Sequence, residues 1–232
     1  MSVEHPTVEP GTVEHRTVDL DAARSALRRG TAVVLPNPAP LTHVVAGTDP
    51  QAVNIAKGRP ADQAVALWAH DPGTLAALGA ALDLSPGLAV AAHRLLTEER
   101  VTLLLPLRPG AAPPDWLAPA TRDGWTLLFG ARWTPLLPLL ADHPVLYVSS
   151  ANRTGRPPAA TAAEALAMFP AAVPVLGAVG AAGDSDGPPR AATTTLRLHP
   201  DGRVDLHRPG AQDRPHGGPD GYLAHVRAAL LP

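Results

Sequence analysis

Hydroxyl and amide side chains gather in one short stretch of the chain, directly after an apolar segment. Residues 145–148 have the composition of a buried strand, and Ser149, Ser150 and Asn152 follow it. Glycine and paired prolines come next, and residues 161–164 have the Thr-x-x-Glu spacing of a capping box that opens a helix. Loops between a strand and a helix are where α/β proteins bind ligands, and these donors suit phosphate or carboxylate. An ordinary Asn/Gly/Pro turn is the alternative.

Two cations stand close together in an earlier segment, Lys57-Gly58-Arg59-Pro60. The proline forces an extended exit from the preceding helix, so that Lys57 and Arg59 can converge on one anion. Arginine offers a planar fork for phosphate and lysine a point charge. Alternatively, the two residues are cations placed favourably at a helix C-terminus. On spacing alone the second interpretation is favoured.

Several kinds of catalytic site are excluded by the sequence. Cysteine is absent, which rules out disulfides, thiolate nucleophiles and zinc–thiolate sites. The ten histidines have no metal-ligand spacing, and neither a G-x-S-x-G elbow nor a Walker motif occurs. The formal net charge of -2 gives no global attraction to nucleic acid or membrane. No apolar segment has the length of a membrane span or the form of a signal peptide, so we expect a cytoplasmic protein.

Strands and helices alternate along the chain. With 45% of its 232 residues hydrophobic, the chain can bury a sizeable core, built mainly from Ala, Leu and Val because only 3% are aromatic. Helices are expected over residues 19–29, 87–96, 134–141, 162–169 and 222–231, and from the Asp-Pro pairs at 49 and 71; strands are expected over 31–35, 44–47, 65–69, 101–105, 125–130, 145–148 and 173–176, with a hairpin over 193–207. This pattern predicts an α/β fold, a twisted mixed sheet with helices on its faces.

The predicted organisation is a single domain with two tails. Residues 1–17 lack an apolar face and are expected to form a flexible arm. The domain occupies residues 18–210, and residues 211–232 are expected to form a linker and a short helix. Both 1–17 and the linker 211–219 are predicted to be dispensable for folding.

Several motifs, in this order, resemble those of the YrdC-like family, the threonylcarbamoyl-AMP synthases. Ser150-Ala151-Asn152 with Gly155 resembles the family's Ser-Ala-Asn signature, and residues 57–60 resemble its Lys-x-Arg-Pro. Further similar segments are Leu35-Pro36 through Gly47 as the first substrate loop, Thr102-Leu103, Gly130-Ala131-Arg132, Thr193-Thr194-Thr195-Leu196 and Arg208-Pro209-Gly210. The resemblance runs from about Asp19 to Gly210 and implies a YrdC-like fold with a large concave cleft.

The resemblance also implies a reaction and its residues. L-threonine, bicarbonate and ATP, with Mg²⁺ accompanying the nucleotide, would give threonylcarbamoyl-AMP and pyrophosphate, in the pathway that modifies tRNA with threonylcarbamoyladenosine. Such a nucleotidyltransferase would use Lys57 and Arg59 as catalytic cations. Substrate contacts would come from Thr42, Arg132, Ser150, Asn152, Thr193, Thr194 and Arg208. No side chain is an obvious covalent nucleophile, so catalysis would rest on positioning and electrostatics.

The first substrate loop departs from the family pattern. Val44 and Val45 stand where the family has an aromatic residue and a glycine, Thr97 to Arg100 replace Trp-Pro-Gly-Pro, and Ala64 replaces a proline. These changes predict weak use of threonine. Two alternatives follow: a protein that binds nucleotide or RNA without synthase activity, or an enzyme that acts on another small amine.

Overall fold

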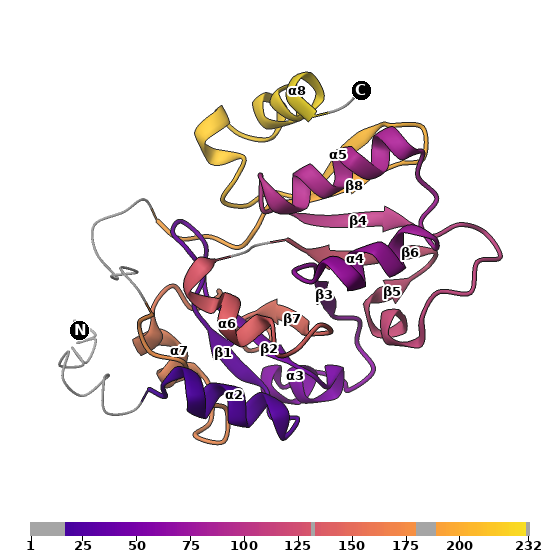
Figure 1. Cartoon of the computed structure of the whole chain (residues 1–232). Helices are drawn as coiled ribbons and strands as arrows, with labels where there is room; N and C mark the ends of the chain where they lie inside the picture. The colour runs from indigo at the N-terminus through magenta and orange to yellow at the C-terminus, as the bar shows by residue number, and fades with distance from the viewer. Residues whose placement is uncertain (1–16, 131–132, 180–188, 231–232) are drawn as a thin grey trace.

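The computed structural model describes residues 17–130, 133–179 and 189–230, and its central element is a nine-stranded mixed sheet (Figure 1). In their order across the sheet, the strands are β1 (Val33–Leu35), β2 (Val44–Gly47), β7 (Tyr147–Ser150), β3 (Ala66–Trp68), β6 (Trp125–Phe129), β4 (Thr102–Pro106), β8 (Thr195–Leu198) and β9 (Val204–Arg208), with β5 (Thr121–Arg122) paired to β6. The pairs β3–β6 and β4–β8 are parallel, and the other pairs are antiparallel. The predicted mixed α/β sheet is therefore confirmed.

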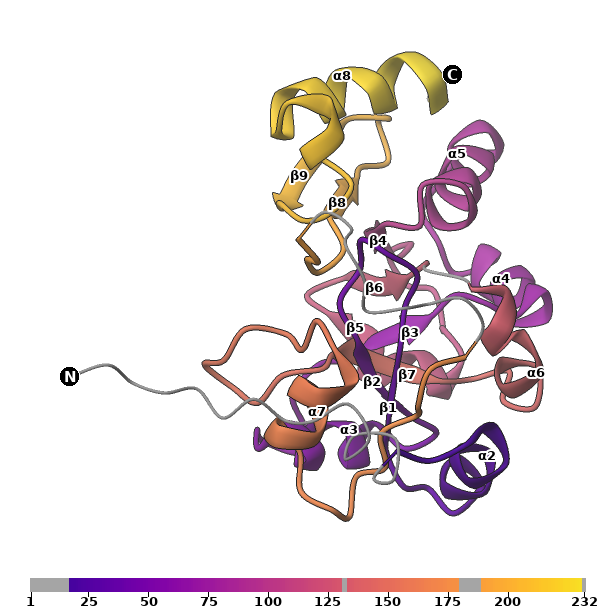
Figure 2. The ribbon, with the colours of Figure 1, turned by 90° about the vertical axis from the view of Figure 1, so that its left-hand side faces the viewer.

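Helices pack around this sheet (Figure 2), and along the chain they alternate with its strands. They are α2 (Leu20–Arg28), α3 (Pro50–Lys57), α4 (Pro72–Gly79), α5 (Pro86–Thr97), α6 (Leu137–Leu140), α7 (Ala162–Met168) and α8 (Pro219–Leu230), with 3-10 turns η1 (Asp115–Ala120), η2 (Thr134–Leu136) and η3 (Arg214–His216). In the part of the chain that the structure describes, none of them has the length and apolar character that crossing a membrane requires.

Local sequence signals fix where the helix before the cation motif begins and ends. Asp49 caps α3 by accepting a hydrogen bond from the backbone N–H of Gln51 at 2.9 Å, and Pro50 occupies the first turn. The helix ends at Gly58, whose φ of 66° is a left-handed conformation that glycine adopts without strain. Lys57 is thereby held in the last turn of α3, next to the strand β7.

The register of the sheet joins segments that are far apart in the sequence. Val44 of β2 pairs with Ser150 of β7, and β7 also pairs with β3 on its other side. Successive strand residues point to opposite faces of the sheet and so belong to two buried clusters. One cluster contains Val34, Val45 and Leu67, and the other contains Val44, Ala46 and Trp68. The carboxyl end of β7 is therefore central in the sheet, between packed layers.

Three stretches differ from the expectation. Residues 106–124, over which no helix or strand was expected, contain η1 and β5, which the proline-rich composition obscured. The predicted strand over 173–176 is reduced to isolated bridges from Val175 to Val34 and from Leu176 to Val18. The strand β7 extends through Ser149 and Ser150, so both hydroxyls belong to the sheet rather than to the loop after it.

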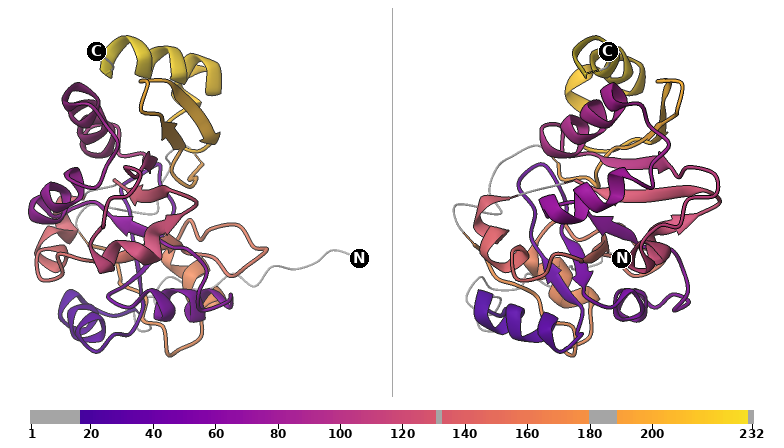
Figure 3. Two further views of the ribbon diagram at one scale, coloured as in Figure 1. Left: turned by 90° about the vertical axis from the view of Figure 1, so that its right-hand side faces the viewer. Right: turned by 45° about the vertical axis from the view of Figure 1, so that its right-hand side comes forward.

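Residues 211–230 pack closely against the rest of the domain. Asp213 is 4% exposed and accepts a hydrogen bond from Thr194 Oγ1 at 2.6 Å, while Tyr222 of α8 is fully buried. Helix α8 lies beside α5 and the β8–β9 hairpin in every view (Figure 3), and Arg94 of α5 donates to the carbonyl of Ala229 at 3.2 Å. These contacts favour a structural role for the segment predicted as a linker. Of the predicted arm, residues 1–17, all but Thr17 lie outside the described residues.

Candidate functional site

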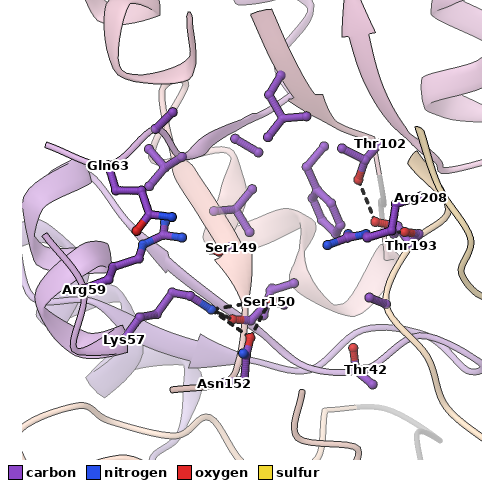
Figure 4. Close-up of a pocket in the computed structure, with 18 of the residues that line it drawn as sticks. Thr42, Lys57, Arg59, Gln63, Thr102, Ser149, Ser150, Asn152, Thr193 and Arg208 are labelled. Carbon is purple, nitrogen blue, oxygen red and sulfur yellow. Dashed lines mark hydrogen bonds between the residues drawn. The ribbon is translucent and has the colours of Figure 1, made fainter. Parts of the chain in front are cut away.

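A cavity of about 380 Å³ opens where α3, the sheet and the loops that follow β1 and β7 meet (Figure 4). Seven of the residues predicted to act on substrate line it: Thr42, Lys57, Arg59, Ser150, Asn152, Thr193 and Arg208. They come from segments that are up to 166 positions apart (208 − 42), so only the fold brings them together. The cavity is the candidate functional site.

The two principal motifs touch each other through Lys57. Its ammonium Nζ donates to the backbone carbonyl of Ser150 and, at 2.8 Å, to Asn152 Oδ1. The Ser150 hydroxyl donates to the same Asn152 oxygen at 2.6 Å and lies 3.4 Å from Nζ. Asn152 in turn donates through Nδ2 to the carbonyl of Arg156 at 2.8 Å, which holds the loop in place. The Ser-Ala-Asn loop is thus built around the lysine.

Burial and neighbouring positive charge alter the chemistry of Lys57. The residue is 4% exposed, and burial together with the charges of Arg59 and Arg208 lowers the pKa of its amine to about 7. Burial also holds the pKa of Arg59 and of Arg208 below its ordinary value. Arginine remains charged at any pH at which the protein is folded.

Asn54, which the sequence did not single out, fixes the orientation of Arg59. Arg59 Nε donates to Asn54 Oδ1 at 2.5 Å, while Arg59 Nη2 is buried and has no hydrogen-bond partner among the described residues. Asn54 is fully buried, and its Nδ2 donates to the carbonyls of Ala61 and Gln63 at 2.8 and 2.7 Å. The guanidinium keeps an unused donor at the cavity wall.

Arg208 and Thr193 form the opposite side of the cavity (Figure 4). Thr193 Oγ1 lies 2.6 Å from Thr102 Oγ1, and Arg208 Nη2 donates to the Thr193 carbonyl at 3.4 Å. Thr194, predicted as a substrate contact, is not among the lining residues, because its buried hydroxyl bonds Asp213 instead. Arg132, also predicted, lies outside the described residues.

The segment between β1 and β2, predicted as the first substrate loop, is fixed by hydrogen bonds from residues that no motif revealed. Arg190 Nη1 donates to the carbonyls of Asn37 and Leu41 at 3.1 and 2.7 Å. Asn37, buried, donates through Nδ2 to the Thr42 carbonyl at 2.9 Å. Val44 lines the cavity, whereas Val45 is fully buried in the core. Of these two valines, only Val44 shapes the site, and Ala64, another replaced position, also lines the cavity.

The cavity has a positive and an apolar part. Its cations are Lys57, Arg59 and Arg208, and none of the described lining residues is Asp, Glu, His, Cys or Tyr. The apolar part includes Ala66, Phe129 and Val148 of the sheet. Hydroxyl and amide groups lie between the two. Such a site suits an anion with an apolar or planar portion.

Comparison with solved structures finds proteins of the same architecture. A doubly substituted variant of P. abyssi Sua5 matches with a TM-score of 0.64 and 18% identity over 92% of this chain. P. abyssi Sua5 complexed with L-threonine matches at 0.58 and 19% over 88% of the chain. E. coli YciO matches at 0.56 and 14% over 83% of this chain and 89% of its own. The chain has the fold of these proteins.

The comparisons also mark a difference in length. The chain spans 60% and 56% of the two Sua5 chains. Full-length HypF in its phosphate- and nucleotide-bound form matches with a TM-score of 0.61 and 17% identity, and the chain covers 30% of it. No protein-family model matches the sequence, and no curated protein matches it either. The YrdC-like fold predicted from the motifs is confirmed.

Proposed function

We propose that the chain binds ATP in this cavity and uses it to join the carbamate of a small amine to AMP. L-threonine is the first candidate for the amine, and the product would then be threonylcarbamoyl-AMP. One observation carries the proposal: Lys57, Arg59 and Arg208 meet Ser150 and Asn152 in a cavity whose described lining has no carboxylate. Phosphate groups need such cations and donors, because their charge must be neutralised.

The reaction has two steps that the site can serve. The amine and bicarbonate give a carbamate and water, and a carbamate oxygen then attacks the α-phosphorus of ATP, with pyrophosphate as the leaving group. Arg59 and Arg208 would neutralise the departing pyrophosphate, and Lys57, Ser150, Asn152 and Thr193 would orient the reactants. Thr194 is proposed to act only by holding the strand end through Asp213.

The similar structures support the choice of ligands. P. abyssi Sua5 was solved with L-threonine and HypF with phosphate and nucleotide, and this chain shares the fold of both. Because the identities are 19% and 17%, the reaction itself rests on the cavity rather than on the likeness. A cytoplasmic location, where ATP and bicarbonate are available, and a place in tRNA modification belong to the same proposal.

Magnesium, which the resemblance implies as the companion of ATP, finds no protein ligands of the usual kind. Proteins hold Mg²⁺ through one or two carboxylates together with substrate phosphates. None of the described lining residues is a carboxylate, and the described part of the chain has no group of three or more His, Cys, Asp or Glu residues that could hold a metal. The described residues do not fit a protein-held Mg²⁺, and no step of the proposed reaction depends on one.

Val44 favours a second candidate, an enzyme for a different small amine or a binding protein for nucleotide or RNA. Val44 lines the cavity and lies opposite Ser150 across the β2–β7 pair. A valine there removes the wall and any phenolic hydrogen bond that an aromatic residue would supply. Phosphate binding would persist, because Lys57 and Arg59 are retained.

Pyrophosphate release tests the proposal directly. The protein is incubated with ATP, labelled bicarbonate and one amino acid or amine at a time, and both pyrophosphate and the labelled carbamoyl-AMP are measured. Release that depends on one amine supports the synthase, and ATP binding without release supports the binding protein. Unchanged ATP affinity in Arg59→Ala would contradict the assignment of the cavity. The matched control is Arg122→Ala, because the Arg122 side chain is 77% exposed and lies outside the cavity.

A further inference from the structure

Lys57 is the sole lysine of the chain. The sequence has 19 lysine and arginine residues in total, and all of them except Lys57 are arginine. Arginine serves wherever a fixed positive charge suffices, and it is the better partner for phosphate geometry. A lysine differs in one chemical respect that matters here: when it is buried, its amine can release a proton near neutral pH. The one lysine lies in the candidate site, where that difference has a use.

No other described lining residue can exchange a proton near neutral pH. The cavity is lined by hydroxyl, amide, apolar and guanidinium groups besides Lys57, without Asp, Glu, His, Cys or Tyr among the described residues. Hydroxyls and amides do not titrate in this range, and guanidinium groups stay protonated. A reaction in the cavity that needs a proton acceptor can therefore use Lys57.

The hydrogen bonds of Lys57 are compatible with both of its protonation states. Its two close contacts, with the Ser150 carbonyl and Asn152 Oδ1, use two N–H groups. The third contact, with Ser150 Oγ, is long at 3.4 Å, and that hydroxyl gives its own proton to Asn152. The third position of the nitrogen is an N–H in the ammonium and a lone pair in the amine. The charges that face it, Arg59 and Arg208, favour the amine, and burial lowers its pKa to about 7.

We propose that Lys57 is the acid–base residue of the cavity and accepts the proton that an amine ligand loses when its nitrogen bonds to carbon. This inference rests on the proposed function. The nitrogen lone pair of the ligand attacks the carbon of bicarbonate, the N–C bond forms, and the nitrogen proton passes to Lys57 Nζ. The C–O bond to the hydroxyl group then breaks, and Lys57 returns the proton to the leaving hydroxide, which departs as water. The carbamate remains, and Lys57 is neutral again.

A measurement on the protein without turnover tests the first requirement. Because the chain has one lysine, protein grown with ¹³Cε-lysine gives one lysine side-chain resonance, and its shift is followed from pH 5 to 11. We expect a midpoint near 7, against an ordinary lysine value of about 10.4. Added pyrophosphate should raise the midpoint, since the anion favours the ammonium. A midpoint above about 9 in the free protein would overturn the proposal whatever the activity.

Turnover in two variants tests the role itself. Lys57→Arg keeps the charge but cannot accept a proton, so we expect pyrophosphate affinity to stay within about threefold while amine-dependent turnover falls about 100-fold or more. Lys57→Ala should regain turnover when small primary amines are added, at rates that follow the pKa of the added amine. A purely structural lysine would show no such dependence.

The two proposals fail in different ways. If Lys57→Arg turns over at the wild-type rate with the wild-type pH profile, Lys57 is only a phosphate cation and the inference is wrong, while the proposed function stands. If wild-type protein does not bind ATP or pyrophosphate, the proposed function is wrong. If it binds them but turns over no amine, both the synthase and the acid–base role are contradicted, and a binding protein remains.

Discussion

Arg59 Nε lies 2.5 Å from the side-chain oxygen of Asn54, a residue with no exposed surface. The amide nitrogen of Asn54 bonds the carbonyls of Ala61 and Gln63, so one side chain joins α3, the guanidinium and the loop that leads into β3. A long flexible cation binds more tightly when its orientation is fixed before the ligand arrives, because less conformational entropy is lost on binding. The Asn54 amide supplies that orientation without adding a negative charge that would compete with the ligand.

Asn54→Ala should weaken anion binding although Asn54 does not line the cavity. Arg59 loses its anchor, so we expect pyrophosphate affinity to fall about threefold to tenfold, corresponding to roughly 1 kcal/mol. The carbonyls of Ala61 and Gln63 also lose their donor, which should lower the free energy of unfolding by about 1–3 kcal/mol. Calorimetry and urea denaturation measure the two effects. Gln51→Ala, an exposed change on the same helix, is the control. Equal affinities in Asn54→Ala and the wild type would show that Arg59 is held by other contacts.

Short continuous motifs could be found in the sequence, and long-range partners could not. Lys57 and Arg59 were found because they stand two positions apart in one continuous motif, Lys57-Gly58-Arg59-Pro60, which resembles a family signature. Asn54 was missed because its importance lies in backbone carbonyls of a loop whose path the sequence does not specify. A pattern of consecutive threonines likewise does not say which one faces the ligand: Thr193 lines the cavity, and its neighbour points to Asp213.

The contacts of the C-terminal segment could not be predicted from the sequence for a similar reason. Residues 211–219 have the composition of a linker, yet Asp213 is buried, and its carboxylate accepts from Thr194 Oγ1 and from the backbone N–H of Gly210, at 2.6 and 2.5 Å. Composition indicates local propensity only. The hydrogen bond to Asp213 depends on the position of Thr194, just before β8, in the folded chain.

Acid should destabilise the protein through His43. This residue is 4% exposed, its Nδ1 has no partner among the described residues, and burial, together with the charge of Arg190, lowers its pKa to about 4. The unfolded chain takes up this proton near pH 6.5 and the folded chain only near 4, so stability present above 6.5 is lost as the pH falls through that window. The loss amounts to about 3 kcal/mol. The free energy of unfolding, measured by urea denaturation at several pH values between 4 and 7, should depend less steeply on pH in His43→Gln than in the wild type. The exposed His93→Gln should leave the slope unchanged.

Raising the pH above 7 should stabilise the protein through Lys57. Its amine has a pKa of about 7 in the folded protein and 10.5 as the reference value, so between these values the unfolded chain binds more protons and the free energy of unfolding rises with pH. Lys57→Met should remove this rise. Denaturation curves at pH 7, 8 and 9 measure it. A wild-type stability that stays level or falls over this range would show that burial does not suppress the charge of Lys57.

Deletion of residues 211–232 should lower the melting temperature strongly, whereas deletion of residues 1–16 should change it by a few degrees at most. The C-terminal deletion removes Tyr222 and Val226, both fully buried, and exposes their neighbours in the core. Tyr222→Phe is the milder companion, because it removes only the hydroxyl that donates to Glu99 at 3.0 Å. Scanning calorimetry compares the chains. Matching transitions for full-length protein and the C-terminal deletion would show that this segment adds nothing to the stability of the fold.

Threonine-dependent pyrophosphate release should be weak in the natural sequence and should increase in Val44→Tyr. Val44 lines the cavity and pairs with Ser150, so a phenol at this position would supply both a wall and a hydrogen-bonding group beside the proposed substrate. Pyrophosphate affinity should stay within about twofold, because Lys57 and Arg59 are untouched. Val45→Gly is the contrasting variant: its fully buried side chain belongs to the core, so its removal should cost about 2–4 kcal/mol of stability without improving turnover. If the natural protein already turns over threonine at about 1 per second or faster, Val44 is no obstacle and the preference for another amine is wrong.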